Sequence, residues 1–565
     1  MAKLRKAEFA FILILLVYAL YAGLFIYRTS FAVEGRRYFA LFDDAMISMR
    51  YARNLAQGQG AVWNAGGERV EGYTNPLWML YMALLHLLPA GPATMSLLVQ
   101  LSALALLLVH LVIVRRVALL VSGGSVFVAL AAVLLTAFYL PLNTWSLLGM
   151  EVSLLLVIVA AATLQALRAL EAGRCSERPD VLRGGGPLER LVAGGRLVGV
   201  GVFLAVADPK HRRQHLAWGL GLLAGFLLPQ TLLRAWYYAD PLPNTYYLKM
   251  TGGPLLLRLS RGLYVFLDFA WNLGWLLFLV PLGAVLWRRR GALLLLPWLF
   301  LAQAAYSVYV GGDAWEWWGG ANRYICLGMP AFLIFAACVL ERLAALLARE
   351  LQPAANPSQP QTTAGHAPRT THHAPRITHH VSRFTFYASR FTPHATRAAL
   401  VALAFVTLTN FDSLYGRQSL AEWLLIERPL HVTDSRRMVQ LALLVDRLAA
   451  PEARVAVVYA GVLPYFLDRP CIDLLGKSDR VVARGRLRVP AGLVKYISYY
   501  PGHQKWDYAH SIGELQPDVV TGLWYAPEEA EPYLAGRYSK VTLQGFTLYL
   551  RDGSPSLRWS VLERP

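Results

Sequence analysis

Long apolar stretches alternate with short polar connections along most of this chain. Apolar stretches cover residues 9–27, 93–114, 118–140, 216–236, 264–287, 292–310, 324–347 and 398–410, and a further one follows Glu151 and runs to Arg168. Most of them approach or exceed the roughly 20 residues that a helix needs to cross a bilayer. The stretch 76–88 is shorter and ends among prolines, which favours an interfacial or re-entrant helix. The pattern predicts a mainly α, polytopic membrane domain over residues 1–413, with about nine to eleven transmembrane helices.

Basic residues beside these stretches predict the orientation of the chain. Lys3, Arg5 and Lys6 precede a first stretch that is too long for a signal peptide and lacks a small-residue cleavage site. We therefore expect it to remain as an anchor with a cytoplasmic N-terminus. Arg115 and Arg116 then also fall on the cytoplasmic side, and residues 28–92 form the first outer loop. The expected location is the cell membrane, crossed several times.

Two segments do not fit the alternation. Residues 171–213 have basic, cytoplasmic-looking ends but one visible apolar run, 197–207, so they cross twice or not at all. Residues 350–397 are rich in Pro, Thr, His and Arg and contain near-repeats. A His-rich run can bind a transition metal, but this segment lacks the apolar surface to order a site. It is predicted to be a disordered cytoplasmic insertion.

The C-terminal residues 414–565 mix charged and apolar segments as a soluble domain does. Residues 454–459 and 518–520 read as buried strands, and residues 461–467 read as a short helix. This pattern predicts a small α/β domain. By the topology above, the domain is extracytoplasmic.

Composition supports the membrane assignment and excludes other classes. Of the 565 residues, 56% are hydrophobic and only 16% are charged. The formal charge of +19 comes largely from arginine clusters beside apolar stretches, so it indicates topology and no nucleic-acid partner is expected. The four cysteines show no CxxC spacing, which indicates neither a zinc site nor a disulfide framework.

An acidic doublet, Asp43 and Asp44, follows the first anchor and opens a polar run that includes Arg50 and Arg53. One interpretation is a solvated loop with a helix-capping Asp. The other is a reaction centre, because the predicted topology brings every strong polar cluster to the outer face. These clusters are 43–75, 240–249, 313–323 and the C-terminal domain. Convergent polar groups near a bilayer mark function by default.

Such a constellation suits several chemistries. A carboxylate could deprotonate an acceptor hydroxyl while cations hold a phosphate leaving group. Asp43 and Asp44 could instead bind a divalent cation through oxygen ligands, although no cofactor is clearly required. A transporter or flippase for a lipid-linked or small polar solute would also place charges in a cavity, but no internal repeat is visible. A structural scaffold would not need the doublet so close to the bilayer.

The sequence resembles the polytopic GT-C glycosyltransferases, above all the terminal arabinofuranosyltransferases of arabinan-containing cell walls. The first outer loop contains DDAMISMRYARNL at 43–55, GQGAVWN at 58–64 and ERVEGYTNPLW at 68–78. Further matches follow in order through the chain: Tyr237-Tyr238, Pro241 to Thr245, Lys249, Gly312-Asp313, Arg323, Gly461, Pro464-Tyr465, Asp473, Gly476 and Pro501-Gly502-His503. Two places depart from the group: 171–213, where only Arg178-Pro179-Asp180 matches an expected turn, and the His-rich insertion.

The resemblance implies transfer of a sugar from a polyprenyl-phosphate donor to a glycan, glycolipid or glycoprotein hydroxyl, usually with inversion, in contact with membrane lipid. It implies that the base is Asp43 or Asp44; we favour Asp43, with Asp44 orienting the acceptor or a cation. By analogy with inverting glycosidases, inversion requires one carboxylate on the acceptor side of the reacting carbon. The remaining expected substrate-binding residues are Arg50, Glu71, Tyr73, Asn75, Asn244, Lys249, Asp313, Arg323 and His503. Among these, Lys249, Arg323 and His503 are expected at the donor phosphate, and Glu71, Tyr73 and Asn75 at the sugar.

Overall fold

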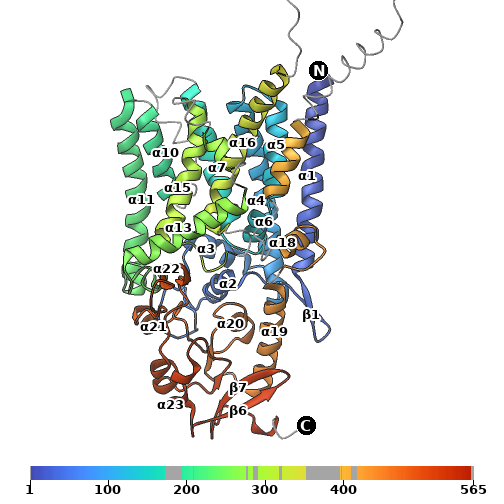
Figure 1. Ribbon diagram of the computed structural model, residues 1–565. Helices are drawn as coiled ribbons and strands as arrows, with labels where there is room; N and C mark the ends of the chain where they lie inside the picture. The colour runs from blue at the N-terminus through green and yellow to red at the C-terminus, as the bar shows by residue number, and fades with distance from the viewer. Residues whose placement is uncertain are drawn as a thin grey trace, which may run out of the picture.

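The computed structural model describes residues 2–171, 194–207, 209–274, 278–283, 291–316, 321–350, 395, 397–408, 416–429 and 431–561. A bundle of long helices forms one part and a smaller C-terminal part with a β-sheet forms the other (Figure 1). The N-terminus lies at the far end of the bundle from the sheet (Figure 1). The predicted insertion 350–397 and the turn Arg178-Pro179-Asp180 lie outside the described residues, apart from residues 350, 395 and 397.

Six described helices are long and apolar enough to cross a membrane, or seven if one bent pair counts as a single span. The six are α1 (Ala2–Thr29), α4 (Pro92–Val121), α7 (Val152–Glu171), α11 (Arg212–Tyr238), α15 (Leu295–Val310, preceded by the 3-10 turn η2, Ala292–Leu294) and α16 (Arg323–Glu350). The protein is therefore a multi-pass membrane protein. The predicted nine to eleven crossings exceed what these described helices supply by length and composition.

Shorter helices explain part of that difference. Helix α3 (Pro76–Leu85) has ten residues, in keeping with the interfacial helix predicted at 76–88. The last apolar stretch forms a helix over Arg397–Leu408. Helix α10 (Gly194–Ala207) contains the apolar run of the ambiguous segment and packs beside α11, joined to it by the short turn η1 (Pro209–His211) (Figure 1).

Two predicted helices have other boundaries. The helix predicted over 118–140 is confirmed with other bounds: α4 continues to Val121, and α5 (Val126–Ala137) begins only after a turn at Gly123 and Gly124. Both glycines have positive φ, which ends α4, and the Ser125 side chain caps α5. A bend of 54° then leads into α6 (Leu140–Leu147), so the prolyl segment expected to be an outer turn is helical.

The second boundary concerns residues 264–287. Helix α13 (Leu255–Asn272) begins nine residues earlier than predicted and ends before Gly274, which has a φ of +85°. The sequence does not show the start of α13, because Arg258 and Arg261 interrupt the apolar pattern there. One face of the helix is nevertheless buried. A further short helical segment covers residues 278–283.

The first outer loop forms its own small layer under the bundle. A hairpin of β1 (Phe31–Val33) and β2 (Arg36–Tyr38) leads to α2 (Asp43–Ala56), and an irregular stretch leads on to α3. Helix α12 (Asn244–Met250) lies in the loop predicted at 237–249. Helices α2, α3 and α6 lie between the bundle and the C-terminal part (Figure 1).

The C-terminal part contains a five-stranded sheet of order β4-β3-β5-β7-β6. Strand β3 pairs in parallel with β4 and β5, and β7 pairs antiparallel with β5 and β6. The strands are β3 (Val455–Val457), β4 (Cys471–Asp473), β5 (Val519–Val520), β6 (Tyr538–Leu543) and β7 (Phe546–Arg551). The predicted strands at 454–459 and 518–520, and the predicted helix at 461–467, are confirmed as β3, β5 and α20 (Val462–Leu467).

Helices and short turns surround this sheet. They are α18 (Gly416–Trp423), α19 (His431–Leu448), α21 (Arg480–Arg484), α22 (Lys495–Ser498), η3 (Ala509–Glu514), η4 (Pro527–Glu529), α23 (Glu531–Leu534) and η5 (Trp559–Val561). Helix α19 packs along α20, and α22 packs against α13 of the bundle. The C-terminal part is thereby docked on the first outer loop and on the adjacent end of the bundle.

Candidate active site

The acidic doublet forms the first two residues of α2. Phe42 occupies the N-cap position, and no side chain caps the helix, so neither Asp acts as the capping residue of the simple alternative. Carboxylates in a first turn are favoured by the helix dipole. Consecutive helical residues point about 100° apart, because a turn contains 3.6 residues. Asp43 and Asp44 consequently face different surroundings.

Asp44 lies among cations. Its Oδ1 accepts a hydrogen bond of 2.6 Å from Lys477 Nζ, and its Oδ2 lies 3.6 Å from an Arg323 guanidinium nitrogen. Burial disfavours its charged form, but attraction to Lys477, Lys249 and Arg323 outweighs burial and lowers the pKa of Asp44 far below its ordinary value. Asp44 is therefore permanently ionised and neutralised by its partners.

Asp43 points toward the C-terminal part. Its Oδ1 accepts a 2.7 Å hydrogen bond from the backbone N–H of Val462 at the start of α20. Burial raises the pKa of Asp43, and the opposing effects of Lys477 and of the Val462 N–H do not cancel it. Gly461 makes the close approach feasible, because a Cβ there would lie only 2.7 Å from the Asp43 carbonyl carbon.

Arg323 and Lys249 supply the other positive charges. Arg323 is 4% exposed and pairs through Nε with Asp313 Oδ2 at 2.8 Å. The ammonium of Lys249 forms no hydrogen bond or ion pair with any residue that the structure describes, although its stem packs against Gly502. Burial and the nearby Arg323 lower the pKa of Lys249, whereas Asp44 and Asp313 oppose that shift. An anion beside Lys249 would relieve this repulsion.

These groups surround a small charged chamber of about 40 Å³. Its charged walls are Asp44, Glu151, Lys249, Arg323 and Lys477, so three cations meet two carboxylates. Asp313 partly neutralises the charge of Arg323 through their ion pair, but it does not line the chamber itself. Such a chamber favours a bound anion.

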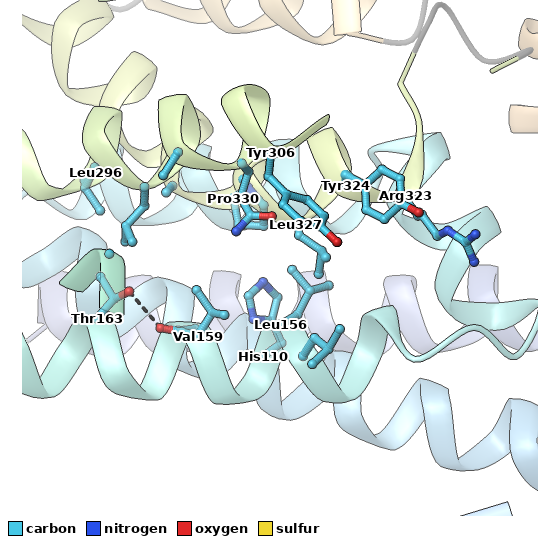
Figure 2. A pocket seen from close by; sticks show the side chains of 18 of the residues that line it. His110, Leu156, Val159, Thr163, Leu296, Tyr306, Arg323, Tyr324, Leu327 and Pro330 are labelled. Carbon is cyan, nitrogen blue, oxygen red and sulfur yellow. Dashed lines mark hydrogen bonds between the residues drawn. The ribbon is translucent and has the colours of Figure 1, made fainter. Parts of the chain in front are cut away.

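A larger, mostly apolar cavity of about 410 Å³ adjoins the chamber. Helices α4, α7, α15 and α16 supply most of its walls. Arg323 lies at one end of the lining side chains, and Thr163 and Leu296 lie toward the other (Figure 2). Four residues line both the cavity and the chamber: Thr74, Asn75, Glu151 and Arg323. The apolar space inside the bundle therefore meets the charged chamber at these four residues.

The structure places the predicted sugar-site residues differently from one another. Tyr73 and Asn75 line the chamber. Glu71 does not line it, because its carboxylate is held at 2.6 and 3.0 Å by the guanidinium of Arg234 on α11. Burial raises the pKa of Glu71 even though Arg234 opposes that shift. Arg50 is buried and donates to the carbonyls of Trp63, Pro464 and Arg469 and to Asn64, so its donors are used in joining α2 to the C-terminal part.

Asn244 and His503 also contact other residues of the protein, and neither lines the chamber. The Asn244 amide donates to the carbonyls of Gly476, Lys477 and Asp479, at 2.9 to 3.1 Å. His503 is buried against Trp315 and outside the chamber lining. Burial, reinforced by Lys477, lowers the pKa of His503 to about 3, so the ring is neutral and offers no charge to a phosphate.

Two chamber residues were missed in the sequence. Lys477 lies in the turn after β4, held by Asn244 and by the Asp473 carboxylate, which accepts from the N–H groups of Leu475, Gly476 and Ser478. A lysine in a Gly-Lys-Ser turn after a buried strand was the available signal. Glu151 is the only acidic residue between Glu71 and Glu171. A single carboxylate in such an apolar region was itself a signal for a site.

The doublet does not fit a divalent cation. Asp43 lines a different cavity from Asp44, and Lys477 and Arg323 already neutralise Asp44. No group of three or more His, Cys, Asp or Glu side chains with metal-site spacing occurs among the described residues. A hard cation prefers several converging oxygen ligands, which this arrangement does not supply.

Comparison with solved structures finds the same fold elsewhere. ArnT from Cupriavidus metallidurans in the apo state superposes with a TM-score of 0.52, and ArnT from Cupriavidus metallidurans bound to undecaprenyl phosphate superposes with 0.53. Each comparison covers 96% of this chain and 98% of the other chain, at 14% sequence identity. A family model described as Domain of unknown function (DUF8728) matches residues 429–555. No curated protein matches the sequence. At this identity the structural likeness concerns the fold.

Proposed function

Because the chain has the GT-C fold that its sequence predicted, we propose that it is a membrane glycosyltransferase. In this proposal it transfers a sugar from a polyprenyl-phosphate donor to a hydroxyl of a glycan, glycolipid or glycoprotein acceptor. A neighbour of the same fold is bound to undecaprenyl phosphate, a lipid of the proposed donor class. Fold alone does not specify chemistry, so the proposal depends on the site.

The observation that carries the proposal is the junction of the apolar cavity with the charged chamber. A polyprenyl phosphate has a long apolar chain and an anionic end, and these match the 410 Å³ cavity and the chamber respectively. Arg323 lines both spaces, and Lys249 lies in the chamber without a partner among the described residues. A phosphate at the junction would satisfy both cations.

The donor sugar requires more room than the structure offers. A chamber of about 40 Å³ holds little more than a water molecule. We therefore expect it to widen when the donor binds, with Tyr73, Asn75 and Glu151 forming the walls around the sugar. Their hydroxyl, amide and carboxylate groups are suited to hydrogen bonds with sugar hydroxyls.

The two aspartates take separate roles in this proposal. Asp43 is the general base, since burial raises its pKa and brings its basicity closer to that needed near neutral pH. Asp44 stays ionised and holds Lys477 and Arg323 for the leaving phosphate. The acceptor oxygen attacks the anomeric carbon, the bond from that carbon to the phosphate oxygen breaks, and the hydroxyl proton passes to Asp43. Attack opposite the leaving group inverts the anomeric centre.

The orientation belongs to the proposal as well. Basic residues near the start of α1 and the end of α4 favour a cytoplasmic position for that end of the bundle. There Arg115 pairs with Glu8, which joins the two helix ends. The chamber and the C-terminal part would then lie on the outer face, which protease protection in sealed vesicles would test.

A reconstituted assay tests the function. Full-length protein in proteoliposomes is given a panel of pentosyl and hexosyl polyprenyl phosphates with candidate acceptors, and transfer is followed by mass spectrometry. We expect turnover with at least one donor and a loss of about 10²- to 10⁴-fold in kcat for Asp43→Asn. Asp468→Asn is the matched control, because the Asp468 side chain is 81% exposed and away from the chamber.

Binding of the donor class is measured separately. Lys249→Gln should weaken undecaprenyl-phosphate binding by about tenfold to a hundredfold, through loss of a charge-assisted contact. Lys495→Gln, on the surface helix α22, should not change that binding. Absence of turnover with every donor, together with flux of a solute or lipid across the membrane, would favour the transporter alternative and overturn the proposal.

A further inference from the structure

A third cavity, of about 280 Å³, adjoins the start of α2. Asp43 lines it, whereas Asp44 does not. Its walls come from the start of α2, from α19 and α20, from loops of the C-terminal part, and from Trp315 between α15 and α16. The cavity is therefore built largely by the C-terminal part, and it meets the doublet through one carboxylate only.

Aromatic side chains dominate the lining. They are Phe42, Trp315, Tyr459, Tyr500, Trp524 and Tyr525. Aromatic faces carry a negative quadrupole and pack well against the weakly positive C–H faces of a sugar ring. Tyrosine hydroxyls add hydrogen-bonding atoms at the ring edges.

The charged groups of this lining exclude an anion. Asp43 and Asp434 contribute carboxylates, and the described lining contains no Lys or Arg. A phosphate would be repelled here, in contrast with the three cations of the chamber. Neutral hydroxyl groups, which donate to carboxylates, match the cavity better.

His431 provides an independent indication of a ligand. It is 6% exposed and lines the cavity, yet neither of its ring nitrogens has a hydrogen-bond partner among the described residues. Leaving such a buried group unsatisfied is costly. Burial lowers the pKa of His431 to about 3, so the neutral ring offers one donor and one acceptor. A polyol presents both complements of that pair.

We infer that the third cavity is the acceptor site and that it binds a terminal sugar of an oligosaccharide chain. This inference rests on the proposed glycosyl transfer and names the class of its acceptor. Asp43 lines this cavity and directly precedes Asp44 of the chamber, so it can accept the proton of the acceptor hydroxyl. The hydroxyl oxygen then bonds to the anomeric carbon as the donor phosphate leaves.

The mouth of the cavity fits a longer chain. Asp434 and Tyr525 are exposed residues of the lining, and Tyr525 is 47% exposed. The cavity therefore opens to solvent beside the C-terminal part, where the remainder of a glycan extends without entering the bundle. About 280 Å³ is at the small end for ligand pockets, which fits a terminal residue better than a lipid anchor.

Calorimetric binding tests the inference without a donor. Full-length protein in lipid nanodiscs is titrated with short linear oligosaccharides of arabinose, mannose, glucose and galactose, and separately with undecaprenyl phosphate. We expect at least one oligosaccharide to bind, and His431→Phe to weaken that binding about tenfold or more. If His431 supported the fold instead, its substitution would lower the Tm. Because Phe removes an unsatisfied buried polar group, we expect the Tm of His431→Phe not to fall.

A second variant and a control complete the test. Tyr525→Ala should also weaken oligosaccharide binding, whereas Tyr496→Ala, outside the lining, should not. Undecaprenyl-phosphate binding should be unchanged in all three variants. Undecaprenyl-phosphate binding without binding of any oligosaccharide would overturn the inference and leave the proposed transferase standing. Unchanged oligosaccharide affinity in His431→Phe, or displacement by a lysophospholipid, would also overturn it. Oligosaccharide binding without undecaprenyl-phosphate binding would support the carbohydrate site and contradict the proposed function.

Discussion

Substitution of Gly461 by alanine tests how strictly the doublet depends on the C-terminal part. Gly461 precedes α20 and lies directly against the backbone of Asp43. An added Cβ would lie 2.7 Å from the Asp43 carbonyl carbon and 2.9 Å from its Oδ1. The closest contacts are with the backbone of the first residue of α2, which cannot move aside as the end of a flexible side chain can.

The size of the disturbance follows from these distances. Carbon atoms in contact are optimally about 3.5 to 4.0 Å apart, so α20 and α2 must separate by about 1 Å. That shift lengthens the 2.7 Å hydrogen bond from the Val462 N–H to Asp43. A misplacement of about 1 Å can reduce turnover about 10²-fold. Overpacking of this kind costs about 1 to 3 kcal/mol of stability, which should leave the protein folded.

Both quantities can be measured on the purified protein. We expect Gly461→Ala to lower kcat of sugar transfer about 10²-fold and to lower Tm moderately. Gly522→Ala is the matched control in the same part of the chain, because a Cβ there would meet nothing within 4 Å. Wild-type turnover and Tm in Gly461→Ala would refute the proposed contact between α20 and the base.

Further predictions concern pH and the supporting residues. Because burial raises the pKa of Asp43, kcat/KM should fall on acidification through a pH above the ordinary Asp value of about 4. The same shift destabilises the fold as pH rises through the raised pKa, so Asp43→Asn should keep or raise Tm at neutral pH, measured by a thermal melt. Asn244→Ala removes three hydrogen bonds to the Lys477 turn and should cost about 1 to 3 kcal/mol while raising the KM for donor. Glu71→Gln removes the negative charge that neutralises Arg234 and should cost about 3 to 5 kcal/mol. A change in sugar preference without a loss of stability would contradict this structural placement of Glu71.

The fold was largely predictable because its main signals are local. The length of each apolar stretch predicts the long membrane helices. The apolar runs at 454–459 and 518–520 predict the buried strands of the C-terminal part. Boundaries failed where a local break competed with hydrophobicity. Gly123 and Gly124 end α4 inside a continuous apolar pattern, and arginines on one face concealed the start of α13. The two glycines change the hydrophobicity too little to register in a membrane-length window, whereas the two arginines lower it enough to hide a helix that buries only one face.

The site was only partly predictable because its groups come from distant segments. The sequence indicated the doublet, Lys249 and Arg323 as site residues. The structure brings Asp44, Lys249 and Arg323 together in the chamber, whereas Asp43 lines the third cavity. Arg50, Glu71 and Asn244 are polar residues of the same segments, but they form their hydrogen bonds with other residues of the protein. Which partner a buried polar residue takes depends on tertiary contacts, so sequence cannot separate such residues from Lys477 and Glu151.

The position of the doublet at a helix start explains why two adjacent carboxylates can serve two spaces. A helix turns about 100° per residue, so Asp44 reaches the cations of the chamber while Asp43 reaches α20 and the third cavity. Arg50 and Arg53, three residues apart on the same helix, bond to backbone carbonyls of the C-terminal part at Pro464 and Tyr465. Rotation of α2 would therefore disturb both carboxylates and both arginines at once. The docking of the C-terminal part thus fixes the direction of each carboxylate, and separation of the two parts should abolish catalysis before it unfolds the bundle.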